Sequence, residues 1–146
     1  MQIKSRSGLA IALSKLKVFE NVNVKLEQYP TDSEIASEVL WDAYMKGDIV
    51  DKTIADLGAG TGILGIGTLL LGAKNVEFIE IDTAAIEILQ QNTEGFENIK
   101  LLNMNVNDYN NKVDVIIQNP PFGTRDKHID KKFLEKAMKL ASTVYS

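Results

Sequence analysis

Cysteine is absent from this chain of 146 residues, and histidine occurs once, at position 128. Disulfide bonds, cysteine-ligated metals and a histidine-cluster metal site are therefore excluded. No apolar run reaches the ~20 residues that a membrane-spanning helix needs, and the first residues are not followed by a signal-peptide core. Because 45% of the residues are hydrophobic, the chain can bury one core. We expect a cytoplasmic protein that folds around this core and holds no metal ion.

Positive charge is scarce in the middle of the chain. The formal net charge is −4, but residues 1–28 and 123–146 each carry +3, whereas the segment between them carries −10. A negative total ordinarily argues against a nucleic-acid partner. If the fold brings the two ends together, however, they form a local basic patch suited to a phosphate backbone. The alternative is a pair of solvated helix faces.

Helical and strand periodicities alternate along the chain. Such alternation predicts βαβ units, right-handed crossovers and an α/β fold with a doubly wound parallel sheet. Thr31 and Glu34 form a capping box that predicts the start of the second helix. The expected helices are 7–19, one from residue 31 onward, 62–71, 83–91 and 131–145, and the expected strands are 53–57, 76–81, 99–104 and 113–118.

The sheet expected from these strands lacks its last members. In the doubly wound order the first strand is central and the fourth lies beside it, so the outer side of the fourth strand has no neighbour if the chain stops at Ser146. We therefore expect a C-terminally incomplete core that is marginally stable by itself.

A glycine-rich turn follows the first expected strand. Glycines allow a tight turn and close backbone approach, and the amides at the start of the next helix favour a carboxylate or a phosphate. The spacing also fits a dinucleotide fingerprint, with Glu80 or Asp82 placed to bind a ribose. Asp56 would repel a pyrophosphate but can receive an ammonium group, so S-adenosylmethionine fits better than NAD. The turn reads Asp56-Leu57-Gly58-Ala59-Gly60-Thr61-Gly62.

Two of the three prolines stand together after the last expected strand, in the tetrapeptide Asn119-Pro120-Pro121-Phe122. The prolines fix φ and remove two backbone donors, so the Asn119 side chain and the Pro120 carbonyl remain available as acceptors. Phe122 adds a stacking face. The tetrapeptide can therefore hold a planar amine, although a proline-stiffened turn is the plainer interpretation.

These segments together resemble the motifs of Rossmann-like class I methyltransferases, which use S-adenosylmethionine. More narrowly, they are similar to the methyltransferase-like protein five family and its archaeal relatives, which methylate N6 of an adenosine in small-subunit ribosomal RNA. The narrower resemblance covers residues 8–146 and rests on Leu26-Glu27-Gln28-Tyr29-Pro30-Thr31 and Asn119-Pro120-Pro121-Phe122-Gly123-Thr124.

The resemblance implies a role for each matching residue. Residues 1–30 supply a helix and a cofactor-closing segment, and residues 31–146 form the cofactor-binding core. Asn119 and Pro120 accept the N–H bonds of the target amine, Pro121 stiffens the turn, and Phe122 stacks on the base. The residues implied in cofactor binding are Gln28, Tyr29, Thr31, Asp56, Gly58, Gly60, Gly62, Glu80, Asp82 and Asn105.

Two features bear on partners and affinity. Asn105 stands where the family usually has an acidic residue that accepts from the adenine amino group, which predicts weaker cofactor binding. The family also works with a small zinc-ribbon activator that covers a sheet edge, here the strand with Ile99, Leu101 and Leu102.

Two other functions remain open. A protein glutamine methyltransferase shares the tetrapeptide motif but typically has tyrosine in place of Phe122. A cofactor-binding fragment without turnover is the third possibility, because the missing strands would leave part of the substrate wall unbuilt.

Overall fold

The computed structural model describes residues 3–19, 31–120 and 129–146. Its centre is a parallel sheet of five strands in the order β3-β2-β1-β4-β5, which confirms the expected doubly wound α/β fold. Because β1 is central, the elements that follow β1, β2 and β4 leave the sheet side by side. The strands are β1 (Thr53–Leu57), β2 (Asn75–Glu80), β3 (Ile99–Asn103), β4 (Val115–Gln118) and β5 (Thr143–Tyr145).

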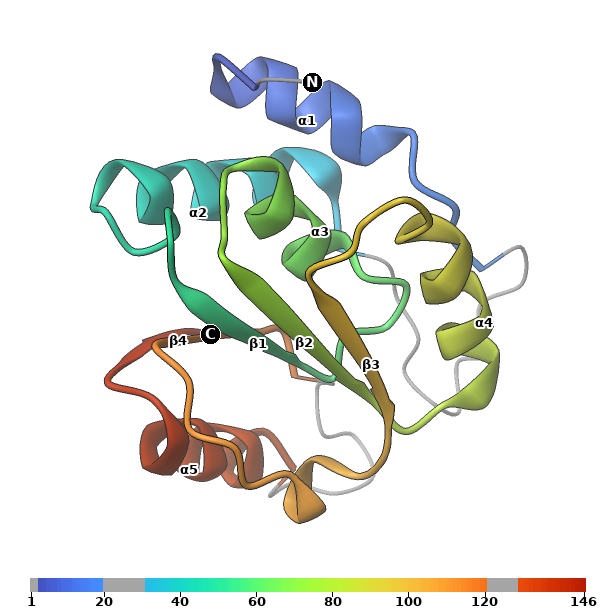
Figure 1. Cartoon of the computed structure of the whole chain (residues 1–146), viewed down its shortest axis with the longest axis vertical. Coiled ribbons are helices and arrows are strands. Elements are labelled where there is room, and N and C mark those ends of the chain that lie inside the picture. Colours follow the sequence, from blue (N-terminus) through green and yellow to red (C-terminus); the bar gives the residue numbers. More distant parts are fainter. Residues whose placement is uncertain (1–2, 20–30, 121–128) are drawn as a thin grey trace.

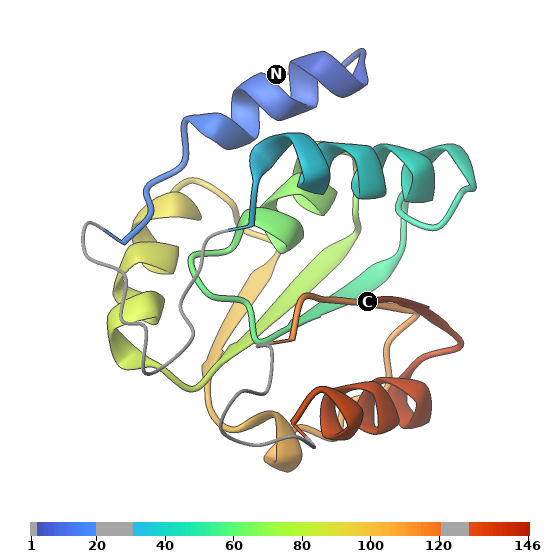
Figure 2. The same cartoon turned by 180° about the vertical axis from the view of Figure 1, so that it is seen from behind.

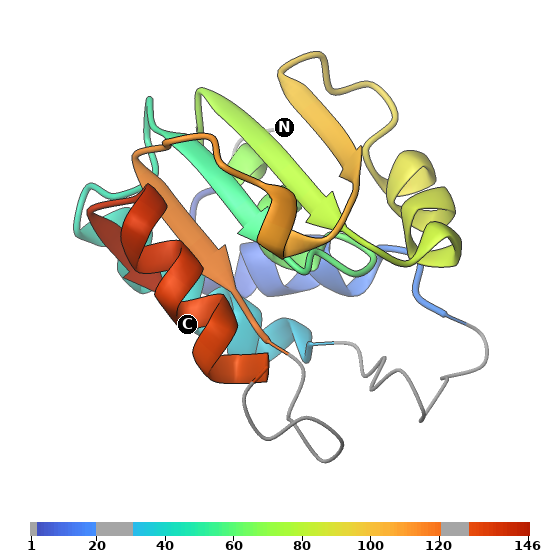
Figure 3. The same cartoon turned by 90° about the horizontal axis from the view of Figure 1, so that it is seen from below.

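Helices cover both faces of the sheet, as Figures 1 and 2 show from opposite sides. On one face lie α2, α3 and α4, with α1 packed on α2 and α3, and on the other lie α5 and the short 3-10 helix η2. Seen from below, α5 lies in front of the sheet and α1 behind it (Figure 3). The helices are α1 (Arg6–Ser14), α2 (Ser33–Met45), α3 (Ile63–Leu70), α4 (Thr83–Asn92), η2 (Val106–Asp108) and α5 (Ile129–Leu140).

The central strand β1 is buried on both faces because its side chains alternate between two hydrophobic clusters. Ile54 packs with the cluster under α1, α2 and α3. Ala55 and Leu57 pack with the cluster under α5. This double burial explains why the strand reads as a nearly continuous apolar run. The polar exception is Asp56, which is described with the site below.

A fifth strand corrects the expectation that the outer side of β4 is unpaired. Thr143–Tyr145 forms β5, which pairs with β4 in parallel register from Val115 to Ile117. The last helix therefore ends at Leu140 rather than at residue 145. Sequence periodicity missed this strand because it has three residues, too few to interrupt a helical pattern, although its threonine, valine and tyrosine favour β structure.

The starts and ends of the first two helices also differ from expectation. Asp32, not Thr31, is the N-cap of α2, and its carboxylate accepts from the amides of Glu34 at 2.7 Å and Ile35 at 3.2 Å. Helix α1 ends at Ser14 instead of residue 19. The physical reason is competition, because the backbone N–H of Lys17 donates to a side chain of α4 and not to the previous helical turn.

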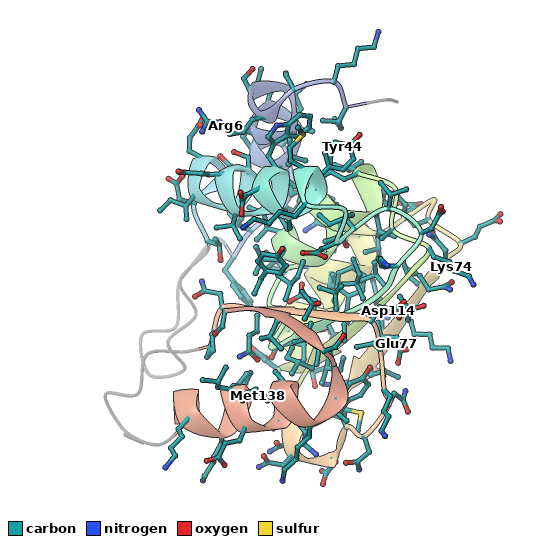
Figure 4. The ribbon with its side chains drawn as sticks, turned by 90° about the vertical axis from the view of Figure 1, so that its left-hand side faces the viewer. Arg6, Tyr44, Lys74, Glu77, Asp114 and Met138 are labelled. Atoms are coloured by element: carbon teal, nitrogen blue, oxygen red, sulfur yellow. The ribbon has the colours of Figure 1, made fainter. Side chains whose placement is uncertain are left out.

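The two basic chain ends do not combine into one patch through their helices. Helix α1 and helix α5 lie on opposite faces of the sheet, and Figure 4 shows Arg6 and Met138 at opposite ends of the molecule. The expected joint patch is therefore wrong for α1 and α5. Three lysines of α5 are exposed on a face that α1 does not share: Lys131, Lys132 and Lys139.

The described residues contain neither a membrane-spanning helix nor a cluster of metal-binding side chains. None of their helices is long and apolar enough to cross a membrane. Nor do the ranges 3–19, 31–120 and 129–146 bring three metal-binding side chains of His, Asp or Glu together. The proposed division of the chain at residue 30 stays a prediction, because residues 20–30 lie outside these ranges.

Candidate active site

The glycine-rich turn between β1 and α3 needs glycine at three positions. Gly58, Gly60 and Gly62 have φ angles of 69°, 60° and 99°, in the left-handed region that other residues rarely adopt. The turn is fixed to the next strand, because the amides of Gly58 and Ala59 both donate to the carbonyl oxygen of Ile79, at 2.8 and 2.9 Å. These two hydrogen bonds and the three left-handed glycines define the shape of the loop.

Asp56 lies beneath this loop with 1% of its surface exposed. Its Oδ2 accepts from the backbone N–H of Gly65 at 2.9 Å, in the first turn of α3. Because the N-cap of α3 is Gly62, which has no side chain, Asp56 supplies the acceptor that a capping side chain would give. Burial raises the pKa of Asp56 to about 7, and the charge of Glu80 adds to this rise, while the Gly65 hydrogen bond lowers it.

Glu80, at the end of β2, joins the glycine loop to the start of α4. Its Oε1 accepts from the amide of Gly60 at 2.8 Å, and its Oε2 accepts from the amide of Asp82 at 2.9 Å. Each carboxylate oxygen keeps a second lone pair, so Glu80 can still accept from ligand hydroxyls. The expected ribose-binding residue thus also holds the loop in place.

Asp82 and Asn105 are both occupied as local caps. Asp82 is the N-cap of α4 and accepts from Ala84 N–H at 3.0 Å. Asn105 is the N-cap of η2 and accepts from Asn107 N–H at 2.8 Å. Asn105 is nevertheless exposed, beyond the carboxyl end of β3. Its amide nitrogen and a second lone pair of its oxygen can therefore face a ligand.

Asn119 leaves the sheet directly beside the glycine loop. Leu57 of β1 and Gln118 of β4 are partners in the parallel register, so Gly58 and Asn119 are the next residues of adjacent strands. Asn119 is exposed, and its Nδ2 donates to the hydroxyl of Thr31 at 3.0 Å. Pro120 is half-buried beside it. The structure thus brings Thr31 next to Asn119, and its expected role beside the cofactor stays a prediction.

The predicted site residues converge at the carboxyl edge of the sheet as far as they are described. Asp56 and Glu80 lie at the carboxyl ends of β1 and β2, and the other members follow the ends of β1 to β4: the three glycines, Asp82, Asn105 and Asn119. This edge is where ligands bind in open α/β sheets. The remaining candidates, Gln28, Tyr29, Pro121 and Phe122, lie outside the described residues.

The geometry of this edge fits S-adenosylmethionine. A Cβ atom on Gly60 would have no heavy atom within 4 Å, so the loop faces open space at its middle glycine. A Cβ atom on Gly62 would instead lie 2.3 Å from Leu89, so that glycine is packed against the core. Glu80 stands beside this open cradle and can accept from hydroxyls, and the buried Asp56 beneath it is a carboxylate that can attract an ammonium group.

Two further residues of the site escaped sequence reasoning. Ile81, between Glu80 and Asp82, has 64% of its surface exposed. A large apolar side chain exposed at a polar edge can cover a flat ring. Asn103, at the end of β3, donates from Nδ2 to the carbonyls of Glu80 at 2.9 Å and Ile81 at 3.0 Å, which fixes this segment. The alternation of polar and apolar residues after β2 was the only signal for Ile81 in the sequence.

Residues 31–143 match the methyltransferase small domain family. This chain belongs to that family. It is 40% identical to the rRNA N(6)-adenosine-methyltransferase METTL5 of Danio rerio, over 94% of this chain and 71% of the fish protein. It is 36% identical to an uncharacterized protein of Methanocaldococcus jannaschii, over 97% of this chain and 69% of that protein.

Solved structures show the same fold for this methyltransferase. A proposed RNA methyltransferase of Pyrococcus horikoshii superposes with a TM-score of 0.91 and 50% sequence identity, covering 95% of this chain and 71% of that one. A Thermoplasma acidophilum protein superposes with a TM-score of 0.76 and 33% identity, covering 95% of this chain and 69% of that one. The expected class I methyltransferase fold and its cofactor, S-adenosylmethionine, are therefore confirmed.

Proposed function

We propose that this methyltransferase transfers a methyl group from S-adenosylmethionine to N6 of an adenosine in ribosomal RNA, in the small subunit. The observation that carries the proposal is the position of Asn119. Its side chain is exposed, and it follows β4, the strand next to the one that the glycine loop follows. The 40% identity to the fish rRNA N(6)-adenosine-methyltransferase supports the same substrate. A ribosomal substrate also fits the expected cytoplasmic location.

In this reaction the residues of the chain hold the adenine amine in position and orient it toward the methyl group. S-adenosylmethionine supplies a methyl group that is already electrophilic when the cofactor is bound. Asn119 Oδ1 and the Pro120 carbonyl oxygen accept the two N–H bonds of the adenine amine, which turns its lone pair toward the methyl group. Holding two reactants in this geometry lowers the barrier by several kcal/mol without a strong base. The N–CH₃ bond would form as the S–CH₃ bond of the cofactor breaks, and the methylated nitrogen would then lose one proton to water.

Three segments at the carboxyl edge of the sheet bind the cofactor: the glycine loop, the end of β2 and the segment after β3. The loop glycines bring backbone amides close to the ligand, and Glu80 accepts from the ribose hydroxyls with the lone pairs that Gly60 and Asp82 leave free. The exposed side chain of Ile81 lies beside Glu80 and covers one face of the adenine ring. Asn105 accepts from or donates to the edge of that ring.

Methylation of isolated RNA tests the proposal. Ribosomal RNA from cells that lack the gene is incubated with the purified protein and S-adenosylmethionine carrying an isotopically labelled methyl group. Mass spectrometry of its nucleosides should then show labelled N6-methyladenosine. A release-factor protein offered in parallel should stay unlabelled. Label in the protein and none in the RNA would favour the glutamine methyltransferase instead, and binding without any transfer would favour the fragment without turnover.

An Asn119→Ala variant tests the residue that carries the proposal. It should lower kcat by about 10- to 100-fold and change cofactor affinity little, because the lost acceptor acts mainly when the amine approaches the methyl group. Asn75→Ala is the matched control, since Asn75 is exposed at the amino end of β2, away from the site. Equal losses in kcat and in cofactor affinity would make Asn119 a structural residue.

We also infer a protein partner for the edge strand β3, which pairs with β2 on one side. By resemblance this partner is a small zinc-ribbon activator. A half-buried edge with Ile99, Leu101 and Leu102 is a pairing liability unless it is covered. Mixing the two proteins should slow hydrogen exchange at residues 99–103 and leave the opposite edge strand, β5, unchanged. Equal protection of both strands, or of neither, would count against this interface.

A further inference from the structure

Thr31 and Asn119 meet although they are 88 positions apart in the chain. Thr31 is half-buried just before α2, and its hydroxyl oxygen lies 3.0 Å from Asn119 Nδ2. Helix α2 does not need this hydroxyl, because Asp32 caps it with two hydrogen bonds. The Thr31 side chain is therefore free to serve Asn119 instead of the helix.

The chemistry of a side-chain amide makes this contact consequential. An amide has an acceptor oxygen on one side and a nitrogen with two donor hydrogens on the other. The adenine amine is a donor, so Asn119 can hold it only through Oδ1. If the amide turned by half a rotation, two donors would face each other. The Thr31 hydroxyl can donate or accept, and in the structure it accepts from Nδ2, which leaves Oδ1 free to point to the amine.

We propose that Thr31 is a positioning residue that holds the amide of Asn119 with its oxygen toward the target amine. This proposal rests on the proposed function. It differs from the expectation that Thr31 closes over the methionine side of the cofactor. A cofactor contact would change the affinity for S-adenosylmethionine, whereas a positioning contact changes kcat.

Two substitutions in the full chain separate these roles. Thr31→Val keeps the shape and removes the hydroxyl, and Thr31→Ser keeps the hydroxyl. Thr143→Val is the matched control, because Thr143 is also half-buried but lies at the amino end of β5. Thr31→Val should lower kcat on ribosomal RNA by about three- to tenfold, the value of one hydrogen bond. Its Kd for S-adenosylmethionine should stay within about twofold, and Thr31→Ser should restore most of the rate.

A second readout does not depend on turnover. In nitrogen-15 spectra, the side-chain NH₂ signals of Asn119 should shift in Thr31→Val, return in Thr31→Ser, and stay unchanged in Thr143→Val. If the wild-type protein methylates no RNA, the proposed function fails but these signals still test the contact. Unchanged signals in Thr31→Val would overturn the proposal. A weakened Kd with an unchanged kcat, or a Thr31→Ser variant as slow as Thr31→Val, would overturn it too.

Discussion

Asn92 and Lys17 pair through both polar groups of one side-chain amide. Asn92 Oδ1 accepts from the backbone N–H of Lys17 at 2.9 Å, and Asn92 Nδ2 donates to the Lys17 carbonyl at 2.9 Å. The same Nδ2 also donates to the carbonyl of Thr61, in the glycine loop, at 2.8 Å. One residue at the end of α4 therefore ties the segment after α1 to the loop that cradles the cofactor.

Asn92→Ala should weaken the binding of S-adenosylmethionine and destabilise the fold together. The variant loses three hydrogen bonds and leaves the Thr61 carbonyl without this donor, so we expect the free energy of unfolding to fall by about 1–3 kcal/mol. Cofactor affinity should fall by about three- to thirtyfold, because the loop loses one of its restraints. Calorimetric titration and thermal unfolding measure the two effects.

Gln91→Ala is the control for Asn92. Gln91 contacts the same segment, but only through an exposed hydrogen bond from Lys17 Nζ at 2.8 Å. It should leave both stability and affinity nearly unchanged. If the two alanine variants behave alike, the amide of Asn92 does not hold the loop.

Gly65→Ala should destabilise the protein even though alanine favours helices. A Cβ atom at this position of α3 would lie 2.3 Å from Cε1 and 2.8 Å from Cζ of Phe78, a rigid ring that is fully buried. Overpacking of this kind costs ~1–3 kcal/mol or more, which exceeds the ~1 kcal/mol gained in helix propensity. Denaturant unfolding measures the difference.

Gly8→Ala makes the same change in α1, where the added Cβ atom would meet only Ser5 Oγ, at 3.2 Å. It should be neutral or stabilising by up to ~1 kcal/mol. A Gly65→Ala variant as stable as Gly8→Ala would mean that Phe78 can move aside, and that the β2–α3 packing is looser than the structure indicates.

The inner strands of the sheet could be predicted from the sequence because β1, β2 and β4 are apolar runs that are mostly buried. The predicted bounds of β1 equal the observed ones, and those of β2 and β3 differ from the observed bounds by at most one residue at each end. β5 could not be predicted, because three residues after a helix carry no periodicity of their own. The predicted cap of α2 is one position too early, because Thr31 and Asp32 are both good N-cap residues and nothing local shows that Asp32 caps the helix while Thr31 contacts Asn119.

The sequence predicts which residues form the candidate site, but it does not predict the hydrogen bonds between them. Glycine spacing and the position of Glu80 identify the cradle, yet nothing local indicates that Glu80 accepts from Gly60, 20 residues earlier. The tie from Asn92 to Lys17 spans 75 residues and has no sequence signature. Such contacts depend on the tertiary fold, which places the ends of strands and helices together.

Glu80→Gln should lower both cofactor affinity and stability. Glutamine has one acceptor oxygen, so the amide of Gly60 or that of Asp82 would face an NH₂ group. With ~1.5–3 kcal/mol for each hydrogen bond to a charged group, the affinity for S-adenosylmethionine should fall by about one to two orders of magnitude. Calorimetric titration checks the affinity.

Glu77→Gln is the matched control for Glu80, on the same strand. Glu77 accepts from Tyr109 OH at 3.2 Å and from Asn111 Nδ2 at 2.8 Å, both through Oε1. A glutamine can accept the same two bonds with its single oxygen. Its affinity for the cofactor should match the wild type, and an equal loss in both variants would argue against a special role for Glu80.

The stability of the cofactor-free protein should fall as pH rises toward 8, because of Asp56. Burial raises the pKa of Asp56 to about 7 from an ordinary value of 3.8. A carboxyl group whose pKa is raised by folding binds its proton more tightly in the folded state. Its contribution is therefore fully present below about pH 4 and is lost as pH rises through 7, on the order of 4 kcal/mol in total. Asp56→Asn, which keeps an acceptor for Gly65, should remove this pH dependence in thermal unfolding.

Cofactor binding should have the opposite pH dependence. The ammonium group of S-adenosylmethionine is attracted by the ionised form of Asp56, which becomes populated as pH approaches 7. Between pH 5.5 and 7 the Kd of the wild-type protein should decrease by up to about tenfold per pH unit, while the cofactor's own amine stays charged. Asp56→Asn should bind weakly and with a flat pH profile. A wild-type profile as flat as that of Asp56→Asn would show that Asp56 serves the first turn of α3 and not the cofactor, and the ammonium would then need a different acceptor.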